Sequence, residues 1–153
     1  MRIVIGAVGR MRGGPEATLV EHFRQRVATW PLEIKEVELK RRVSPDSVAA
    51  AEAELLLATV PDGAYTFVLD ETGKLSTSTG IAKQLGALQD EGRRDVAFLI
   101  GGADGHGDGV RKRADHVMAF GRNTWPHLVT RGLLVEQIYR AQQILAGHPY
   151  HRA

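Results

Sequence analysis

The sequence predicts an α/β protein in which helices cover both faces of a parallel sheet. Apolar runs of strand length alternate with segments of helical periodicity along the whole chain, which is the pattern of parallel βα units. Residues 96–100 are apolar at every position, as expected for a strand buried on both faces. The chain has 153 residues, enough for one domain with a proper core, so we predict a single domain over residues 1–153.

The first half of the chain contains two strand–helix units. Residues 2–8 are apolar and predict a strand, and Pro15 suits the first turn of a helix that ends at Trp30. Residues 32–39 predict a second strand, and residues 44–46, Ser-Pro-Asp, have the composition of a helix start. The apolar faces predicted for the two helices are Leu19, Val20, Phe23 and Val27, and Val48, Ala51, Leu55 and Leu56.

The second half continues the alternation. Residues 65–69 predict a third strand, and apolar positions from 81 to 88 have helical spacing. Strands are then predicted at 96–100 and 116–120. Residues 127–146 predict the longest helix, with a glycine directly after it to cap its end.

The composition excludes several kinds of site. Without cysteine the chain has no disulfide, no thiolate nucleophile and none of the usual zinc cages. No apolar stretch is long enough to cross a bilayer, and the N-terminal apolar run is too short for a signal peptide, so we expect a cytoplasmic protein without a membrane partner. The formal net charge of +2 permits a polyanionic partner without requiring one. Basic clusters, each also consistent with a solvated loop, occur at Lys40-Arg41-Arg42, Arg93-Arg94 and Arg111-Lys112-Arg113.

Three loops are the candidates for a ligand site, because ligands of parallel sheets bind beyond the carboxyl ends of the strands. These loops follow Leu69, Ile100 and Phe120. Residues 101–109 contain five glycines directly after the most apolar strand, which lets backbone amides approach a ligand closely. Position 110 is valine, so the spacing of a dinucleotide-binding loop is not met. A flexible surface turn is the alternative interpretation.

The segment 69–74 also lies at a strand end. Its acidic side chains, Asp70 and Glu71, suit a ribose hydroxyl or a cation, and an ordinary glycine-containing turn is the alternative. A phosphate-binding Walker loop is excluded at Gly73-Lys74, because the glycine it needs five residues earlier is Val68.

The long helix and the tail after it form the last candidate region. Glu136 and Arg140 are four residues apart and can form a surface pair, while the apolar stripe of the helix can pack on the core or on a second subunit. The tail, residues 148–153, combines aromatic and cationic groups that suit an unpaired base beside phosphates. His148 and His151 lack a third ligand at suitable spacing, so we predict no metal.

These segments, in this order, resemble the SPOUT class of RNA methyltransferases, and most closely its minimal bacterial family, the 23S rRNA pseudouridine-N3 methyltransferases. The resemblance spans the chain and is most specific from residue 66 onward. The matching strings are Leu69-Asp70 with Gly73-Lys74, Phe98-Leu99-Ile100-Gly101-Gly102 with Gly105, Pro126-His127, Arg131, Glu136-Gln137-Ile138-Tyr139-Arg140-Ala141 and His148-Pro149-Tyr150-His151-Arg152.

The resemblance implies a C-terminal deep trefoil knot, S-adenosylmethionine as cofactor, 23S rRNA within the ribosome as substrate, and a homodimer in which one subunit's tail lies near the other's cofactor. Methylation of a pseudouridine at N3 needs a base, for which histidine is suited. The cofactor contacts implied are Leu69, Gly101, Phe120, Gly121, Arg122, Asn123, Thr124 and Trp125. The residues implied at the target base are His127, Tyr150, His151 and Arg152, with the base being His127 or His151.

Three other functions stay open at this point. The substrate of a methyltransferase of this class can be transfer RNA, although the absence of a visible additional RNA-binding domain favours an assembled ribosome. A non-catalytic ribosome-associated or nucleotide-binding module can share the fold, and cofactor binding separates it from an enzyme. A flavodoxin-like redox domain would carry bound flavin.

Overall fold

A computed structural model describes residues 1–152 of the chain, and its strands and helices alternate as the sequence predicts. The strands are β1 (Arg2–Val8), β2 (Leu32–Val37), β3 (Tyr65–Leu75), β4 (Asp95–Ile100) and β5 (His116–Ala119). The helices are α1 (Pro15–Arg24), the 3-10 turn η1 (Pro45–Ser47), α2 (Val48–Leu57), α3 (Ser78–Asp90), α4 (Asp108–Arg113) and α5 (His127–Leu145).

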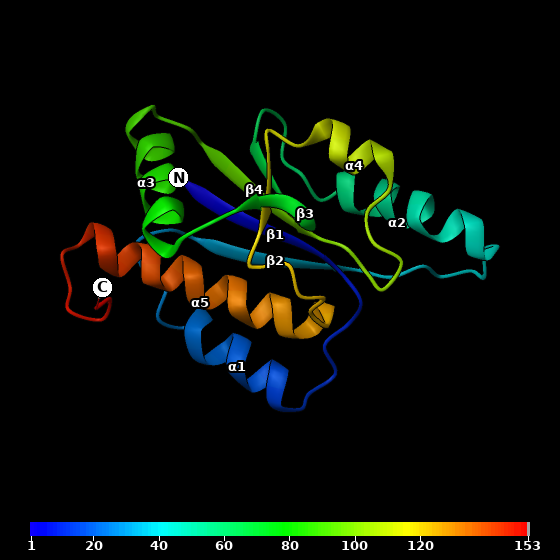
Figure 1. Cartoon of the computed structure of the whole chain (residues 1–153), viewed down its shortest axis with the longest axis horizontal. Coiled ribbons are helices and arrows are strands. Elements are labelled where there is room, and N and C mark those ends of the chain that lie inside the picture. Colours follow the sequence, from blue (N-terminus) through cyan, green and yellow to red (C-terminus); the bar gives the residue numbers. More distant parts are fainter. Residues whose placement is uncertain (153) are drawn as a thin grey trace.

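The five strands form one sheet in the order β2-β1-β4-β3-β5, and every neighbouring pair is parallel. All carboxyl ends therefore lie along one edge, with those of β4, β3 and β5 next to one another. Figure 1 shows the sheet between two groups of helices. The predicted fold class, a parallel sheet flanked by helices, is confirmed.

Helices cover both faces of the sheet because neighbouring residues of each strand point to opposite sides. In β4, Phe98 packs into a core with α1, α3 and α5, whereas Leu99 packs into a second core with α2 and α4. Phe98 also stacks on Phe67 of β3, with ring centroids 4.7 Å apart. A strand buried on both faces explains the unbroken apolar run that the sequence shows there.

The third strand is longer than predicted. We expected it to end at Leu69, but β3 continues to Leu75 after a register shift between Leu69 and Lys74, and this extension pairs with β5. Gly73 makes the pairing possible, since a Cβ there would lie 2.7 Å from the backbone N and C of Met118. The glycine interpreted as part of a turn is needed for a close approach of two backbones.

Other boundaries also differ from the prediction. The first helix ends at Arg24, so Val27 lies beyond it, and β2 ends at Val37 rather than at residue 39. The helix start expected at residues 44–46 is η1, and α2 follows it. Helix α4 falls in a stretch for which no element was predicted, because Gly107 and Gly109 obscure its short periodicity. Among residues 1–152, the structure contains no helix both long enough and apolar enough to span a bilayer.

Candidate functional site

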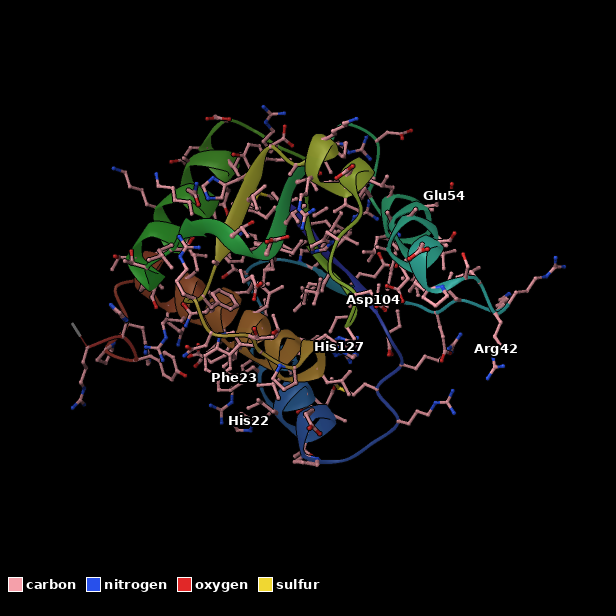
Figure 2. The ribbon with its side chains drawn as sticks, turned by 45° about the vertical axis from the view of Figure 1, so that its right-hand side comes forward. His22, Phe23, Arg42, Glu54, Asp104 and His127 are labelled. Atoms are coloured by element: carbon pink, nitrogen blue, oxygen red, sulfur yellow. The ribbon has the colours of Figure 1, made fainter. Side chains whose placement is uncertain are left out.

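A cavity of about 440 Å³ lies at the carboxyl ends of β3, β4 and β5. We call it the cleft, and it is lined by residues of the segments 69–72, 100–106 and 118–127, together with Arg111 and Thr130. Figure 2 labels two residues of its wall, Asp104 from the loop after β4 and His127 from the start of α5. Its volume lies in the usual range for small-molecule sites.

The three loops singled out from the sequence meet in the cleft. Its lining includes seven of the eight residues expected to contact a cofactor: Leu69, Gly101, Phe120, Gly121, Asn123, Thr124 and Trp125. Gly101 is tightly packed, since a Cβ there would lie 3.1 Å from the carbonyl oxygen of Gly105. The glycines of this loop therefore bring backbone close to the space a ligand would fill.

Arg122, the eighth of these residues, does not line the cleft. Its Nη1 donates to the carbonyl oxygens of Glu71 and of Gly73, the latter at 2.8 Å. The hydroxyl of its neighbour Thr124 donates to a carboxylate oxygen of Glu71 at 3.1 Å. The loop after β5 is thus held against the segment after Leu69, and Arg122 supports the wall of the cleft.

His106 is a cleft residue that the sequence analysis did not single out. Its side chain is buried, and its Nε2 donates to the carbonyl oxygen of Leu69 at 2.8 Å. Burial lowers the pKa of His106, so the imidazole is neutral and carries its proton on Nε2. Within residues 1–152 its buried Nδ1 has no hydrogen-bond partner. The glycine-rich sequence around His106 gave no periodicity that would have predicted its burial.

Asp70 brings a negative charge to the cleft. Burial would raise its pKa, but hydrogen bonds from the hydroxyl and amide of Thr72 and from Arg111 outweigh burial and lower the pKa to about 2. Arg111 of α4 lies 2.9 Å from the Asp70 carboxylate. The pair ties α4 to the end of the Leu69 segment and leaves Asp70 ionised at neutral pH.

His127, the first residue of α5, also lines the cleft. Burial, and then the charge of Arg131 one turn along the helix, lower the pKa of His127, which favours the neutral imidazole. Gly9, after β1, packs against this ring, since a Cβ at Gly9 would lie 2.9 Å from Nε2. The ring is thus positioned by the β1 loop as well as by its own helix.

Arg131 is almost completely buried and connects three elements. It donates to the carbonyl oxygens of Val8 and Gly9 at 3.2 and 2.9 Å, and it pairs with Glu36 of β2 at 3.1 Å. The motif match pointed to Arg131 without giving it a role. Its contacts show that it fixes the loop that packs against His127.

The tail residues lie at the opposite end of α5 from His127 (Figure 1). The hydroxyl of Tyr150 donates to Glu136 at 3.0 Å. The Cζ atom of Arg140 lies over the Tyr150 ring, 4.7 Å from the ring centroid. His151 Nδ1 lies 3.3 Å from Arg140 Nη1, and Arg152 is exposed. With 19 residues, α5 is roughly 28 Å long, so the single chain does not bring the tail to its own cleft.

Glu136 and Arg140 do more than form the expected pair. Their ion pair is 2.6 Å long, and both contact Tyr150. His148, considered as a metal ligand, instead accepts a hydrogen bond from the Tyr150 amide at 3.1 Å. The pair therefore organises the start of the tail.

The cleft combines glycine-lined backbone, apolar walls and an ionised carboxylate at the edge where parallel sheets bind small ligands. This arrangement defines an α/β protein with a candidate ligand site at the ends of three adjacent strands. A family model described as "Predicted SPOUT methyltransferase" matches residues 1–151. The chain belongs to the SPOUT methyltransferase family, which confirms the resemblance seen in its motifs.

Relatives agree over the full length of the chain. It is 54% identical to a protein of Rhodospirillum centenum and 53% identical to one of Paramagnetospirillum magneticum, each named "Ribosomal RNA large subunit methyltransferase H". These matches cover 100% of both chains in the first case and 99% of both in the second. A solved structure of a probable methylase family protein from Haemophilus influenzae has a TM-score of 0.60 at 11% identity, covering 99% of this chain and 70% of that one. This last likeness bears on the fold alone, and the trefoil knot remains a prediction.

Proposed function

We propose that this protein transfers a methyl group from S-adenosylmethionine to N3 of a pseudouridine in 23S rRNA of the assembled ribosome, in the cytoplasm. The observation that carries the proposal is the cleft, where seven residues expected to contact a cofactor come together from three separate loops. The names of full-length relatives, which describe them as methyltransferases of large-subunit ribosomal RNA, support the choice of substrate.

The residues of the cleft fit this cofactor. Phe120 and Trp125 give it accessible apolar surface suited to an adenine ring. Gly101 and Gly121 leave backbone amides and carbonyls accessible, and the ionised Asp70 suits hydroxyl or ammonium donors. When bound, the cofactor supplies an electrophilic methyl group on a sulfonium, so the protein needs mainly to position the nucleophile.

We assign to His127 the role of accepting the proton that leaves N3 of the pseudouridine. The nucleophile must lose this proton before or during attack, and a neutral imidazole is a suitable acceptor near neutral pH. The lowered pKa of His127 and its place in the cleft wall support the assignment. Gly9 packing against the ring restricts its orientation.

The tail completes the site from a second copy of the chain in a homodimer. Tyr150, His151 and Arg152 lie at the far end of α5 from the cleft of their own subunit, which makes a second subunit necessary for them to act there. Exposed Trp125 at the cleft and exposed Leu145 near the tail offer apolar surface for such a contact. Arg152 would then bind phosphate or stabilise charge on the target base.

The decisive experiment incubates ribosomes from a strain lacking this modification with the protein and S-adenosylmethionine. Mass spectrometry of rRNA fragments should show one added methyl group on a pseudouridine. Separated subunits and transfer RNA, treated in parallel, test the ribosome requirement and the alternative substrate. Cofactor binding without methylation of any of these RNAs would contradict the proposed reaction.

A further inference from the structure

Two loops beside the cleft carry a concentration of positive charge. Because the sheet is parallel, the loops after β1 and β2 emerge at the same edge as the cleft, on the β1 side of β4. The first loop contains Arg10 and Arg12, and the second contains Lys40, Arg41 and Arg42. We call these five residues the basic rim.

The two loops are fixed to each other. The amide of Gly9 donates to the carbonyl oxygen of Val37 at 2.8 Å, and the amide of Met11 donates to Glu36 at 2.6 Å. Glu38 lies 3.3 Å from Arg10 and 3.8 Å from Arg12. Glu36 of β2 and Glu38, which follows the strand, thus hold the β1 loop beside the β2 loop, and the charges of the basic rim have a defined location.

The charge of the basic rim is mostly uncompensated. Lys40, Arg41 and Arg42 form no ion pair with any of residues 1–152, and Figure 2 shows the side chain of Arg42 extending away from the body of the protein. Glu38 is shared between Arg10 and Arg12, both of which stay largely exposed. The basic cluster at α4 differs, because there Arg111 and Arg113 are each paired with an aspartate.

The β1 loop of the basic rim adjoins the cleft. Gly9, directly before Arg10, contacts the ring of His127, which lines the cleft. An RNA whose base enters the cleft would therefore pass its neighbouring phosphates near the β1 loop. The pair Arg93-Arg94 precedes β4 and so lies at the opposite edge of the sheet. It has the same charge as Arg41-Arg42 without access to the cleft.

We propose that the basic rim binds the phosphate backbone of the RNA beside the target nucleotide. This inference rests on the proposed function and adds a second surface to it. Phosphate contacts by lysine and arginine release counterions, so binding falls with salt, and each lost contact lowers the salt dependence. Such contacts fix the register of an RNA without reading its sequence. Arginine forks suit phosphate better than a lysine point charge does.

The first test compares the double variant Arg41→Gln/Arg42→Gln with the matched control Arg93→Gln/Arg94→Gln. Binding of a short fluorescein-labelled RNA is measured by anisotropy over a range of salt. The rim variant should bind about tenfold more weakly and show a salt slope smaller by about 1 to 2, whereas the control should behave as wild type. S-adenosylmethionine affinity, measured by calorimetry, should be unchanged in both. Equal RNA binding by the two variants would overturn the proposal.

A second test looks for an increase in RNA affinity, which an unfolded variant would not show. Glu38→Gln frees Arg10 and Arg12 from their shared carboxylate, so RNA affinity and salt slope should both rise. The control is Glu91→Gln, which removes the acid 3.7 Å from Arg93 at the opposite edge and changes the net charge equally. An equal rise in both variants would mean that net charge alone acts, and the proposal would fail.

The two proposals can fail separately. If wild-type protein methylates ribosomes but the rim variant binds RNA and reacts like wild type, only the basic rim is wrong. If the rim and control variants differ in RNA binding as expected but no rRNA is methylated by wild type, the basic rim stands as an RNA surface and the proposed reaction fails.

Discussion

The Nε2 atom of His106 lies 2.8 Å from the carbonyl oxygen of Leu69, joining the glycine-rich loop after β4 to the strand beside it. Both residues line the cleft. Their hydrogen bond joins two segments of the cleft wall and involves no charged group, because burial lowers the pKa of His106 and favours its neutral form. The shape of the cleft therefore depends on a buried hydrogen bond that a substitution can remove.

Replacing His106 by leucine should weaken cofactor binding and folding together. The Leu69 carbonyl would lose its donor, which costs about 1–3 kcal/mol for a buried group. Urea unfolding would measure the stability, and calorimetry with S-adenosylmethionine would measure the affinity. His106→Gln, which retains an amide donor, should lose less of both, and an equal loss in the two variants would argue against the hydrogen bond as the cause.

Two glycines should respond in opposite ways to alanine. At Gly73 the added Cβ would lie 2.7 Å from backbone N and C of Met118, so Gly73→Ala should destabilise the protein by about 1–3 kcal/mol or more. At Gly109, inside α4, the added Cβ would meet only Leu57 at 3.6 Å, and Gly109→Ala should be neutral or stabilise by about 1 kcal/mol. Thermal unfolding of both variants checks the contrast. Similar melting temperatures for the two variants would contradict the prediction, because β3 and β5 would then move apart to admit the added methyl group at Gly73 without loss of stability.

Elements with a clear period were predictable, and those formed by tertiary pairing were not. The run at residues 96–100 and the helix that begins at His127 follow from apolar patterning, and both occur as expected. The extension of β3 to Leu75 was not predictable, since residues 70–74 contain no apolar side chain and pair only because Met118 lies beside Gly73. The sequence around Gly73 does not indicate that Met118 lies beside it in the fold.

The site was predictable in its location and incomplete in its details. The rule that ligands bind at the carboxyl ends of parallel strands identified the three loops of the cleft. The roles of His106 and Arg122 depend on hydrogen bonds to backbone atoms of distant segments, which no spacing in the sequence reveals. The tail stays predicted beside the target base of a partner subunit, and its distance from its own cleft is a consequence of the length of α5.

Asp70 should make stability depend on pH in the acidic range. Its pKa in the folded protein, about 2, lies below the ordinary value of 3.8, so its contribution is present above pH of about 4 and lost as pH falls toward about 2. The shift corresponds to about 2 kcal/mol. Asp70→Asn should therefore be less stable than wild type by about this amount at neutral pH and should approach wild type near pH of about 2. Urea unfolding at both pH values measures the difference, and a constant difference would contradict the role of the charge.

His127 should determine the acid side of the pH–rate profile. Burial and Arg131 lower its pKa, so the neutral form persists below the ordinary value of 6.5 and activity should fall only under more acidic conditions. His127→Asn should reduce transfer about 100-fold or more and flatten the acid side of the profile, with little change in cofactor affinity. Single-turnover rates on ribosomes over a pH series provide the measurement. An unchanged profile in the variant would point to His151 as the base.

Complementation between two inactive variants should reveal whether the tail acts on the partner's cleft. Deleting residues 150–153 removes the tail but leaves the cleft, whereas Gly101→Val fills the cleft, where even a Cβ would lie 3.1 Å from the Gly105 carbonyl oxygen. Each variant alone should lose methyl transfer, and the truncated protein should still bind S-adenosylmethionine. A mixture allowed to exchange subunits should regain transfer, because one cleft of each mixed dimer is intact and faces an intact tail. If the tail acted within its own chain, no subunit of the mixture would hold both parts and transfer would stay absent. The effect also requires a dimer, so a monomeric mass by light scattering for fully active wild-type protein would contradict it independently.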